Sequence, residues 1–509
     1  MKNQLKTGVL ISYATMLVSN IIPMVYTPIM LRILGQAEYG IYGISNSISN
    51  YLYLLNMGLG GTIIRYLSKY RASGEHEKEE QVAGMFFQVY CVLSVVIVAA
   101  GMGIAHNIHL YDNALTPSEL EILRKLVILN TINTAAFMPF NVMGSILVAH
   151  EEFIVNKGVA LVTTILTPFL NLAFLYAGWG SVGFPIVTII TNALGYGVYT
   201  PYAFRKIGVR PRFGRPDWPL LKEIFRFTIL VFLTRLVDAL YWSTDRLIIG
   251  WAIGSVATAV YNVGAVFNGH VSSFSNAISS VLVPKLTHME VQNAEPAAFT
   301  EIFIRIGRLQ YIIVAFVVSA FVAFGRQFIA LWAGSGYEEA YAVAILTMVP
   351  AMIGQIQNTG TNILYAKNKH LFRAVTYFFA AVLNIALTVF WIKGFGIVGA
   401  ALATCIACVL EDGIIMNWYY HKKIKIDIPL FWKNILKMSP IAVMMGVAAW
   451  HILEVLRMDS WVEFFAYAVV YTLVYFLLSY RFVMNEYERN TFFGLVENVI
   501  RRVSRGRKT

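Results

Sequence analysis

Runs of about twenty or more apolar residues, separated by short polar loops, follow one another along nearly the whole chain. A run of that length crosses the hydrocarbon core of a bilayer as a helix. With 58% hydrophobic and only 13% charged residues, the chain is too apolar for an ordinary soluble domain. The sequence therefore predicts an all-α integral membrane protein with about fourteen transmembrane helices. The predicted spans are 7–33, 40–67, 82–105, 120–148, 157–179, 182–204, 224–250, 255–285, 303–332, 339–365, 371–393, 396–420, 437–457 and 461–483.

Basic residues predict the orientation of these spans. They gather in every second loop, and the loops between are nearly free of Lys and Arg. The basic loops contain Lys69, Arg71 and Lys78, then Arg205, Lys206, Arg210, Arg212 and Arg215, then Lys367 and Lys369, and finally Lys422, Lys423 and Lys425. The positive-inside rule therefore predicts that both termini are cytoplasmic. The net charge of +12 follows mostly from this asymmetry and requires no nucleic-acid partner.

An internal repeat divides the chain. Asn171-Leu-Ala, the Gly178 to Gly183 turn and Thr188 recur as Asn384-Ile-Ala, the Gly394 to Gly399 turn and Thr404. An even number of spans in each copy implies two parallel, pseudo-symmetric six-helix bundles, an arrangement typical of transporters. The predicted parts are an N-terminal lobe at 1–206, a C-terminal lobe at 223–425, two additional transmembrane helices at 432–484, and a basic amphipathic cytoplasmic tail at 485–509.

The seventh predicted span carries four charges inside a membrane-crossing run. Arg235 and Arg246 fall almost on one line of the helix, and Asp238 and Asp245 fall on a neighbouring line, with Trp242 between them. We name these five residues the charged stripe. Charges in the bilayer need partners or a water-filled cavity, so the stripe predicts a functional site. The alternative is a set of internal ion pairs that only hold the bundle together.

Two further spans are unusually polar. The second span of each half carries a run of Asn, Ser and His residues, from which we expect Asn46, Asn50, Asn268 and His270 to line a cavity. Polar residues also join membrane helices to one another, and a hydrogen-bonded core position is the alternative for His270. Glu411 and Asp412 are adjacent in the twelfth span, which suggests that one of them is poorly paired and titrates with protons.

The order of several short motifs resembles a known family. Pro28, Leu31-Arg32-x-Leu34-Gly35 and Glu38-Tyr39-Gly40 look like the opening motif of Wzx-type polysaccharide flippases. So do Gly58-Leu59-Gly60 with Arg65, and Thr244-Asp245-Arg246-Leu247 with Gly250 and Tyr261. These flippases belong to the multidrug/oligosaccharidyl-lipid/polysaccharide exporter superfamily, and the resemblance extends over nearly the whole chain.

The resemblance implies a transporter that moves undecaprenyl-diphosphate-linked oligosaccharides from the inner to the outer leaflet of a bacterial plasma membrane. Movement would proceed by alternating access and serve cell-surface polysaccharide export, in association with a polymerase and chain-length machinery. Arg235, Arg246, Arg32 and Arg65 suit a diphosphate, because guanidinium groups stay charged and present a fork of donors. Asp238 and Asp245 would pair with these arginines in the empty state, or would bind a coupling H⁺ or Na⁺. Snorkelling is the alternative for Arg65, and a cap at the cavity mouth is the alternative for Asp245 and Arg246.

Three other functions are weighed against this prediction. A lipid II flippase also handles a polyprenyl diphosphate, and the sequence barely separates the two. A multidrug or cation exporter would be expected to show an acidic, aromatic-lined pocket. A membrane glycosyltransferase is disfavoured because the outer loops are short and their acidic residues are scattered. The sequence has no phosphate-binding Gly loop and no metal-ligand cluster, so we predict a protein that is not an enzyme and that has no metal or cofactor.

Overall fold

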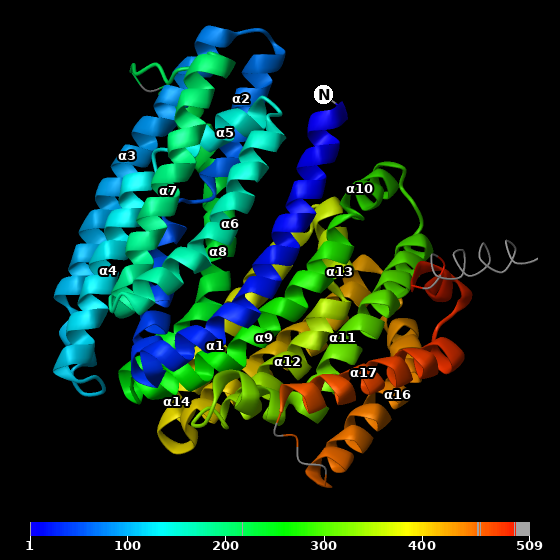
Figure 1. Ribbon diagram of the computed structural model, residues 1–509. Helices are drawn as coiled ribbons and strands as arrows, with labels where there is room; N and C mark the ends of the chain where they lie inside the picture. Colours follow the sequence, from blue (N-terminus) through cyan, green and yellow to red (C-terminus); the bar gives the residue numbers. More distant parts are fainter. Residues whose placement is uncertain (1, 216, 456–457, 459, 493, 495–509) are drawn as a thin grey trace, which may run out of the picture. The chain divides into compact units, whose positions relative to one another are not determined.

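A computed structural model describes residues 2–492 and 494, apart from 216, 456, 457 and 459, and every regular element among them is helical (Figure 1). The elements are α1 Lys2–Leu54, α2 Leu59–Ala72, α3 His76–His106, η1 Ile108–Tyr111, α4 Pro117–Phe137, α5 Asn141–Ala149, α6 Phe153–Tyr176, η2 Gly180–Val182, α7 Gly183–Tyr202, η3 Ala203–Ile207, α8 Trp218–Ala252, α9 Ser255–Ser280, α10 Val283–Val291, α11 Pro296–Ala333, α12 Ala340–Ile356, α13 Asn358–Ala366, α14 His370–Cys408, η4 Val409–Ile415, α15 Met416–Tyr419, η5 Tyr420–Ile424, α16 Ile428–Val455, α17 Trp461–Leu478 and η6 Ser479–Val483. The predicted all-α class is confirmed. Most of the predicted amphipathic tail, from residue 495 onward, lies outside the described residues.

Eight of the helical segments are long and apolar enough to cross a membrane, or ten if two bent helix pairs each count as one span. Two of these segments, Ala14–Ala72 and His370–Ile424, are far longer than one crossing. If each bent pair counts as one span and each of these two long segments counts as two, the total is twelve. Adding the more polar helices α8 and α9 gives fourteen, the predicted number. The prediction of a many-spanning helical membrane protein is therefore confirmed.

Kinks fall where the sequence predicts turns. The helix α1 continues through the predicted turn at 33–40 but is kinked at Gly35, which has φ 74°. The helix α14 runs through the predicted turn at 393–396 with a kink at Gly396. These segments are therefore continuous helices with one glycine in the left-handed region, a conformation that costs glycine nothing.

The two halves break their helices at corresponding places. In the first half α4 and α5 meet at a 43° bend, and in the second half α12 and α13 also meet at 43°. Gly180 and Gly396, which the repeat aligns, both have φ 57°. The second span of each half is also interrupted, between α1 and α2 and between α9 and α10. The repeat seen in the sequence is thus a repeat of helix breaks as well.

The helices pack into two compact units, one of Met1–Asn262 with Ile385–Ala400 and the other of Val263–Asn384 with Ala401–Thr509. The helix α8 belongs to the first unit, where it packs along α1. The units therefore do not follow the lobe limits of 1–206 and 223–425, and those lobes stay a prediction.

Small residues bring helices of the first unit close together. A Cβ on Gly40 would lie 1.8 Å from the Ser255 carbonyl oxygen, and a Cβ on Gly43 would lie equally close to the Asn262 amide nitrogen. Membrane helices use such small residues to let their backbones approach. The Gly40 of the opening motif therefore serves as the contact point between α1 and α9.

Candidate functional site

The charged stripe lies on α8 in the first unit, and its arginines are not neutralised by its aspartates. Arg235 is the middle residue of α8 and is exposed, while Arg246 is half-buried and donates from Nη1 to the Trp242 carbonyl at 3.3 Å. Among the described residues, no ion pair joins either arginine to Asp238 or Asp245. The pairing of these aspartates with the arginines stays a prediction. Arg235 makes no hydrogen bond with the residues that the structure describes, so its donors are available for an anion.

Asp245 is part of a buried polar junction. Its side chain is 2% exposed and accepts hydrogen bonds from the Tyr261 hydroxyl at 2.7 Å and the Thr388 hydroxyl at 3.3 Å. These partners come from α9 and α14, so three helices meet at one carboxylate. Both hydroxyls satisfy a group that would otherwise be costly to bury. The motif residues Asp245 and Tyr261 thus contact each other, and Asp245 holds helices together.

The polar face of α1 contacts α8 beside the stripe. The Tyr51 hydroxyl donates to the Ala239 carbonyl at 3.2 Å and lies 2.5 Å from the Thr244 hydroxyl. Asn46 is half-buried and Asn50 is exposed on the same helix, Arg32 is exposed just before the Gly35 kink, and Arg65 is exposed on α2. All four predicted arginines and both α1 asparagines therefore belong to one compact unit.

Asn268 and His270 belong to the second unit, on the part of α9 that follows residue 262. Asn268 is buried and its Oδ1 atom accepts no hydrogen bond, whereas His270 is half-buried. A buried acceptor without a partner is uncommon in folded proteins. Asn268 therefore keeps an acceptor that a water molecule or a ligand can occupy.

A carboxyl pair forms the second polar centre of that unit. Glu411 is 2% exposed, lies in the π-helix η4 and is followed directly by Asp412. Two adjacent carboxyl groups repel each other when both are ionised, and burial strengthens this repulsion. The pair is therefore a candidate site for proton binding.

One guanidinium serves both carboxyl groups. Arg373, near the start of α14, interacts electrostatically with Glu411 and Asp412, although its Nε atom and the Glu411 Oε1 atom have no hydrogen-bond partner. Asp412 packs so closely on α12 that a Cβ on Gly354 would lie 2.2 Å from its Oδ2. Arg373 is not among the site residues predicted from the sequence, where its only signal is a single arginine in the first turn of an apolar run.

Comparison with known proteins identifies the family. A family described as "Polysaccharide biosynthesis protein" matches residues 5–290. The curated "Uncharacterized membrane protein EpsK" of Bacillus subtilis (strain 168) is 19% identical over 472 residues, which cover 91% of this chain and 92% of that protein.

Three solved structures share the fold. "Lipid II flippase MurJ, inward closed conformation" has a TM-score of 0.71 at 13% identity and covers 96% of this chain and 99% of its own. An inward-facing multidrug resistance MATE family transporter of the MOP superfamily has a TM-score of 0.60 at 15% identity, with coverages of 82% and 99%. A MOP superfamily transporter from Pyrococcus furiosus Vc1 has a TM-score of 0.59 at 14% identity, with coverages of 84% and 96%.

The solved structures that share this fold are a flippase and two transporters. The match to residues 5–290 includes α1 from residue 5 onward, α2 and the whole charged stripe on α8. The chain belongs to the polysaccharide biosynthesis protein family and has the fold of a MOP-superfamily membrane transporter.

Proposed function

We propose that this protein carries a polyprenyl-diphosphate-linked oligosaccharide from the inner to the outer leaflet of a bacterial plasma membrane by alternating access. One observation carries the proposal. Arg32, Arg65 and Arg235 are exposed on membrane helices of a single unit, and among the described residues they make no hydrogen bond or ion pair. Family membership supports the saccharide part of the substrate.

The position of Arg235 explains why an anion is the expected ligand. An arginine at the centre of a spanning helix costs about 2.5–3.5 kcal/mol on insertion scales unless it reaches water or a counter-charge. Within the part of the chain that the structure describes, no ion pair joins Arg235 to a carboxylate. A diphosphate would supply it, because phosphate oxygens match the two parallel donors of a guanidinium.

Coupling forms a second part of the proposal. Glu411 and Asp412 share one Arg373, so full ionisation would leave one negative charge uncompensated inside a spanning segment. Binding or release of a proton at this pair is less costly than burying the extra charge. We therefore assign H⁺ coupling to Glu411 and Asp412, ahead of Na⁺.

Lipid II is the nearest alternative substrate, because it too joins a polyprenyl chain to a diphosphate. A cation exporter fits less well, since the exposed groups of the stripe include an arginine at mid-helix. We further propose that both termini are cytoplasmic and that the protein works beside a polysaccharide polymerase, as the family of the chain suggests.

Reconstitution of the full chain into vesicles tests the proposal. Fluorescent undecaprenyl-diphosphate oligosaccharide is supplied on one leaflet, and its appearance on the other is measured. We expect Arg235→Gln to slow flipping by at least about tenfold, since a lost charge-assisted hydrogen bond contributes about 1.5–3 kcal/mol. Arg226→Gln is the matched control, because Arg226 is also exposed on α8 but lies about 180° around the helix.

Equal flipping by the wild type and Arg235→Gln, with unchanged thermal stability, would sink the proposal. Vesicles that contain lipid II separate the two substrate classes. If lipid II moves faster than the oligosaccharide, and Arg235→Gln slows its flipping equally, then the arginine site binds the peptidoglycan precursor instead.

A further inference from the structure

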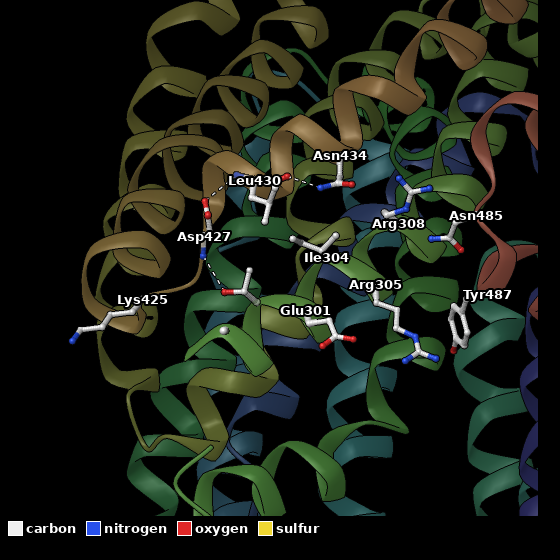
Figure 2. Close-up of a pocket in the computed structure, with 12 residues that line it drawn as sticks. Glu301, Ile304, Arg305, Arg308, Lys425, Asp427, Leu430, Asn434, Asn485 and Tyr487 are labelled. Atoms are coloured by element: carbon white, nitrogen blue, oxygen red, sulfur yellow. Dashed lines mark hydrogen bonds between the residues drawn. The ribbon is translucent and has the colours of Figure 1, made fainter. Parts of the chain in front are cut away.

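A cavity of about 950 Å³ opens in the second unit, away from the carboxyl pair (Figure 2). The first turns of α11, the loop before α16, the first turns of α16 and the segment after η6 line it. In the proposed orientation these helix ends lie at the inner leaflet, at the depth of lipid headgroups. Its lining combines both signs of charge with apolar side chains such as Ile304 and Leu430.

Two of the five charged side chains that line this cavity already have polar partners. The Asp427 carboxylate accepts from the Leu430 amide at 3.0 Å and caps α16. The Arg308 guanidinium binds the Glu488 carboxylate. Figure 2 shows the Lys425 side chain extending away from the other labelled residues. These groups therefore shape the cavity and leave little capacity for a ligand.

Among the described residues, Glu301 and Arg305 are the charged side chains of α11 at this cavity that form no ion pair. They stand four residues apart on α11 in the order that favours an ion pair, yet no ion pair forms between them. The Arg305 guanidinium instead stacks over the Tyr487 ring, with its central carbon 3.5 Å from the ring centre. Figure 2 shows Arg305 between Glu301 and Tyr487. Tyr487 thus holds the positive group apart from the negative group, and both line the same cavity.

We propose that this cavity binds the phosphoethanolamine headgroup of a membrane phospholipid. The Arg305 guanidinium, stacked on Tyr487, presents its edge N–H groups to the phosphate. The Glu301 carboxylate accepts hydrogen bonds from the ammonium. Phosphocholine has no N–H donors for Glu301, and phosphatidylglycerol has no cation. The arrangement therefore selects among three lipids that differ only in the headgroup.

Native mass spectrometry of the intact protein in detergent, titrated with these three lipids, tests the proposal independently of any flipping activity. We expect the wild type to retain phosphatidylethanolamine at least about tenfold better than phosphatidylcholine or phosphatidylglycerol. Glu301→Gln should remove this preference while phosphate-dependent binding persists, and Arg305→Gln should weaken all three lipids. Lys422→Gln, an exposed change outside the cavity lining, should alter nothing.

Glu301 is exposed and forms no ion pair with any residue that the structure describes, so its replacement by the amide of the same shape leaves the fold intact. Equal retention of the three lipids by the wild type overturns the proposal. So does a preference for phosphatidylethanolamine that survives Glu301→Gln. Soluble glycerophosphoethanolamine should displace the lipid, whereas displacement by inorganic phosphate at the same concentration would assign the cavity to free phosphate instead.

Discussion

Arg308 on α11 binds both carboxylate oxygens of Glu488, which lies 180 residues further along the chain. Its Nε donates to Oε1 at 2.5 Å and its Nη2 donates to Oε2 at 2.9 Å. The side chains are only 11% and 1% exposed. Glu488 also accepts from the Asn485 amide, and the Glu488 amide donates to the Asn485 side chain, so one carboxylate both caps a turn and receives an arginine. The segment after α17 is thereby fixed to α11.

Removal of Arg308 should destabilise the second unit strongly. Arg308→Ala leaves Glu488 buried without its counter-charge, which costs about 3–5 kcal/mol for a buried pair. The measurement is thermal unfolding of the purified protein in detergent. Arg308→Met combined with Glu488→Leu should unfold at a temperature closer to the wild type than Arg308→Ala does. Equal losses in the single and double variants would contradict the argument.

Asp245 should behave as a structural residue. Asp245→Asn should lower the stability of the protein by about 1–3 kcal/mol, because the bonds from Tyr261 and Thr388 lose their charged acceptor. Tyr261→Phe should reproduce part of this loss. Asp238→Asn, at a half-buried position on the same helix, is the control, and we expect it to lower stability less. A larger loss in Asp238→Asn than in Asp245→Asn would refute this assignment.

A methyl group at Gly40 should separate α1 from α9. Gly40→Ala places Cβ 1.8 Å from a backbone oxygen that cannot move alone, so we expect a loss of about 1–3 kcal/mol, typical of overpacking. Gly61→Ala provides the matched control, because Gly61 is helical and a Cβ there meets nothing within 4 Å. Its substitution should be neutral or slightly stabilising. Thermal unfolding of both variants checks the contrast.

Glu411→Gln should remove the pH dependence of transport. Glutamine mimics the protonated carboxyl and cannot release its proton, so flipping should no longer respond to a pH gradient across the vesicle. Asp412→Asn should have the same direction of effect, since it removes the other carboxyl group of the pair. Glu338→Gln, in the exposed loop between α11 and α12, should leave the response unchanged. A full response to the gradient in Glu411→Gln would exclude this pair as the coupling site.

The sequence predicted the helices and their turns far better than their partners. Hydropathy and glycine positions predicted turns at the places where the structure has kinks, Gly35 and Gly396, because both depend on local properties of the chain. The partners of Asp245 could not be predicted, since Thr388 lies 143 residues away and a hydroxyl is common in membrane helices. The contact between Arg305 and Tyr487 was hidden for the same reason. Angular position on one helix shows which residues share a face but not which neighbour that face meets.

The two 43° bends have a mechanical consequence. At each bend the backbone bonds run to acceptors three residues back, from the Asn141 amide to Met138 at 3.1 Å and from the Gln357 amide to Gly354 at 3.2 Å. As such a turn straightens, each amide can exchange its hydrogen bond to the carbonyl three residues back for the α-helical bond to the carbonyl four residues back. The number of backbone hydrogen bonds therefore stays constant. In hydrocarbon a lost backbone bond costs several kcal/mol, and flexing is therefore least costly where bonds are exchanged and not broken. Each unit thus contains its own hinge.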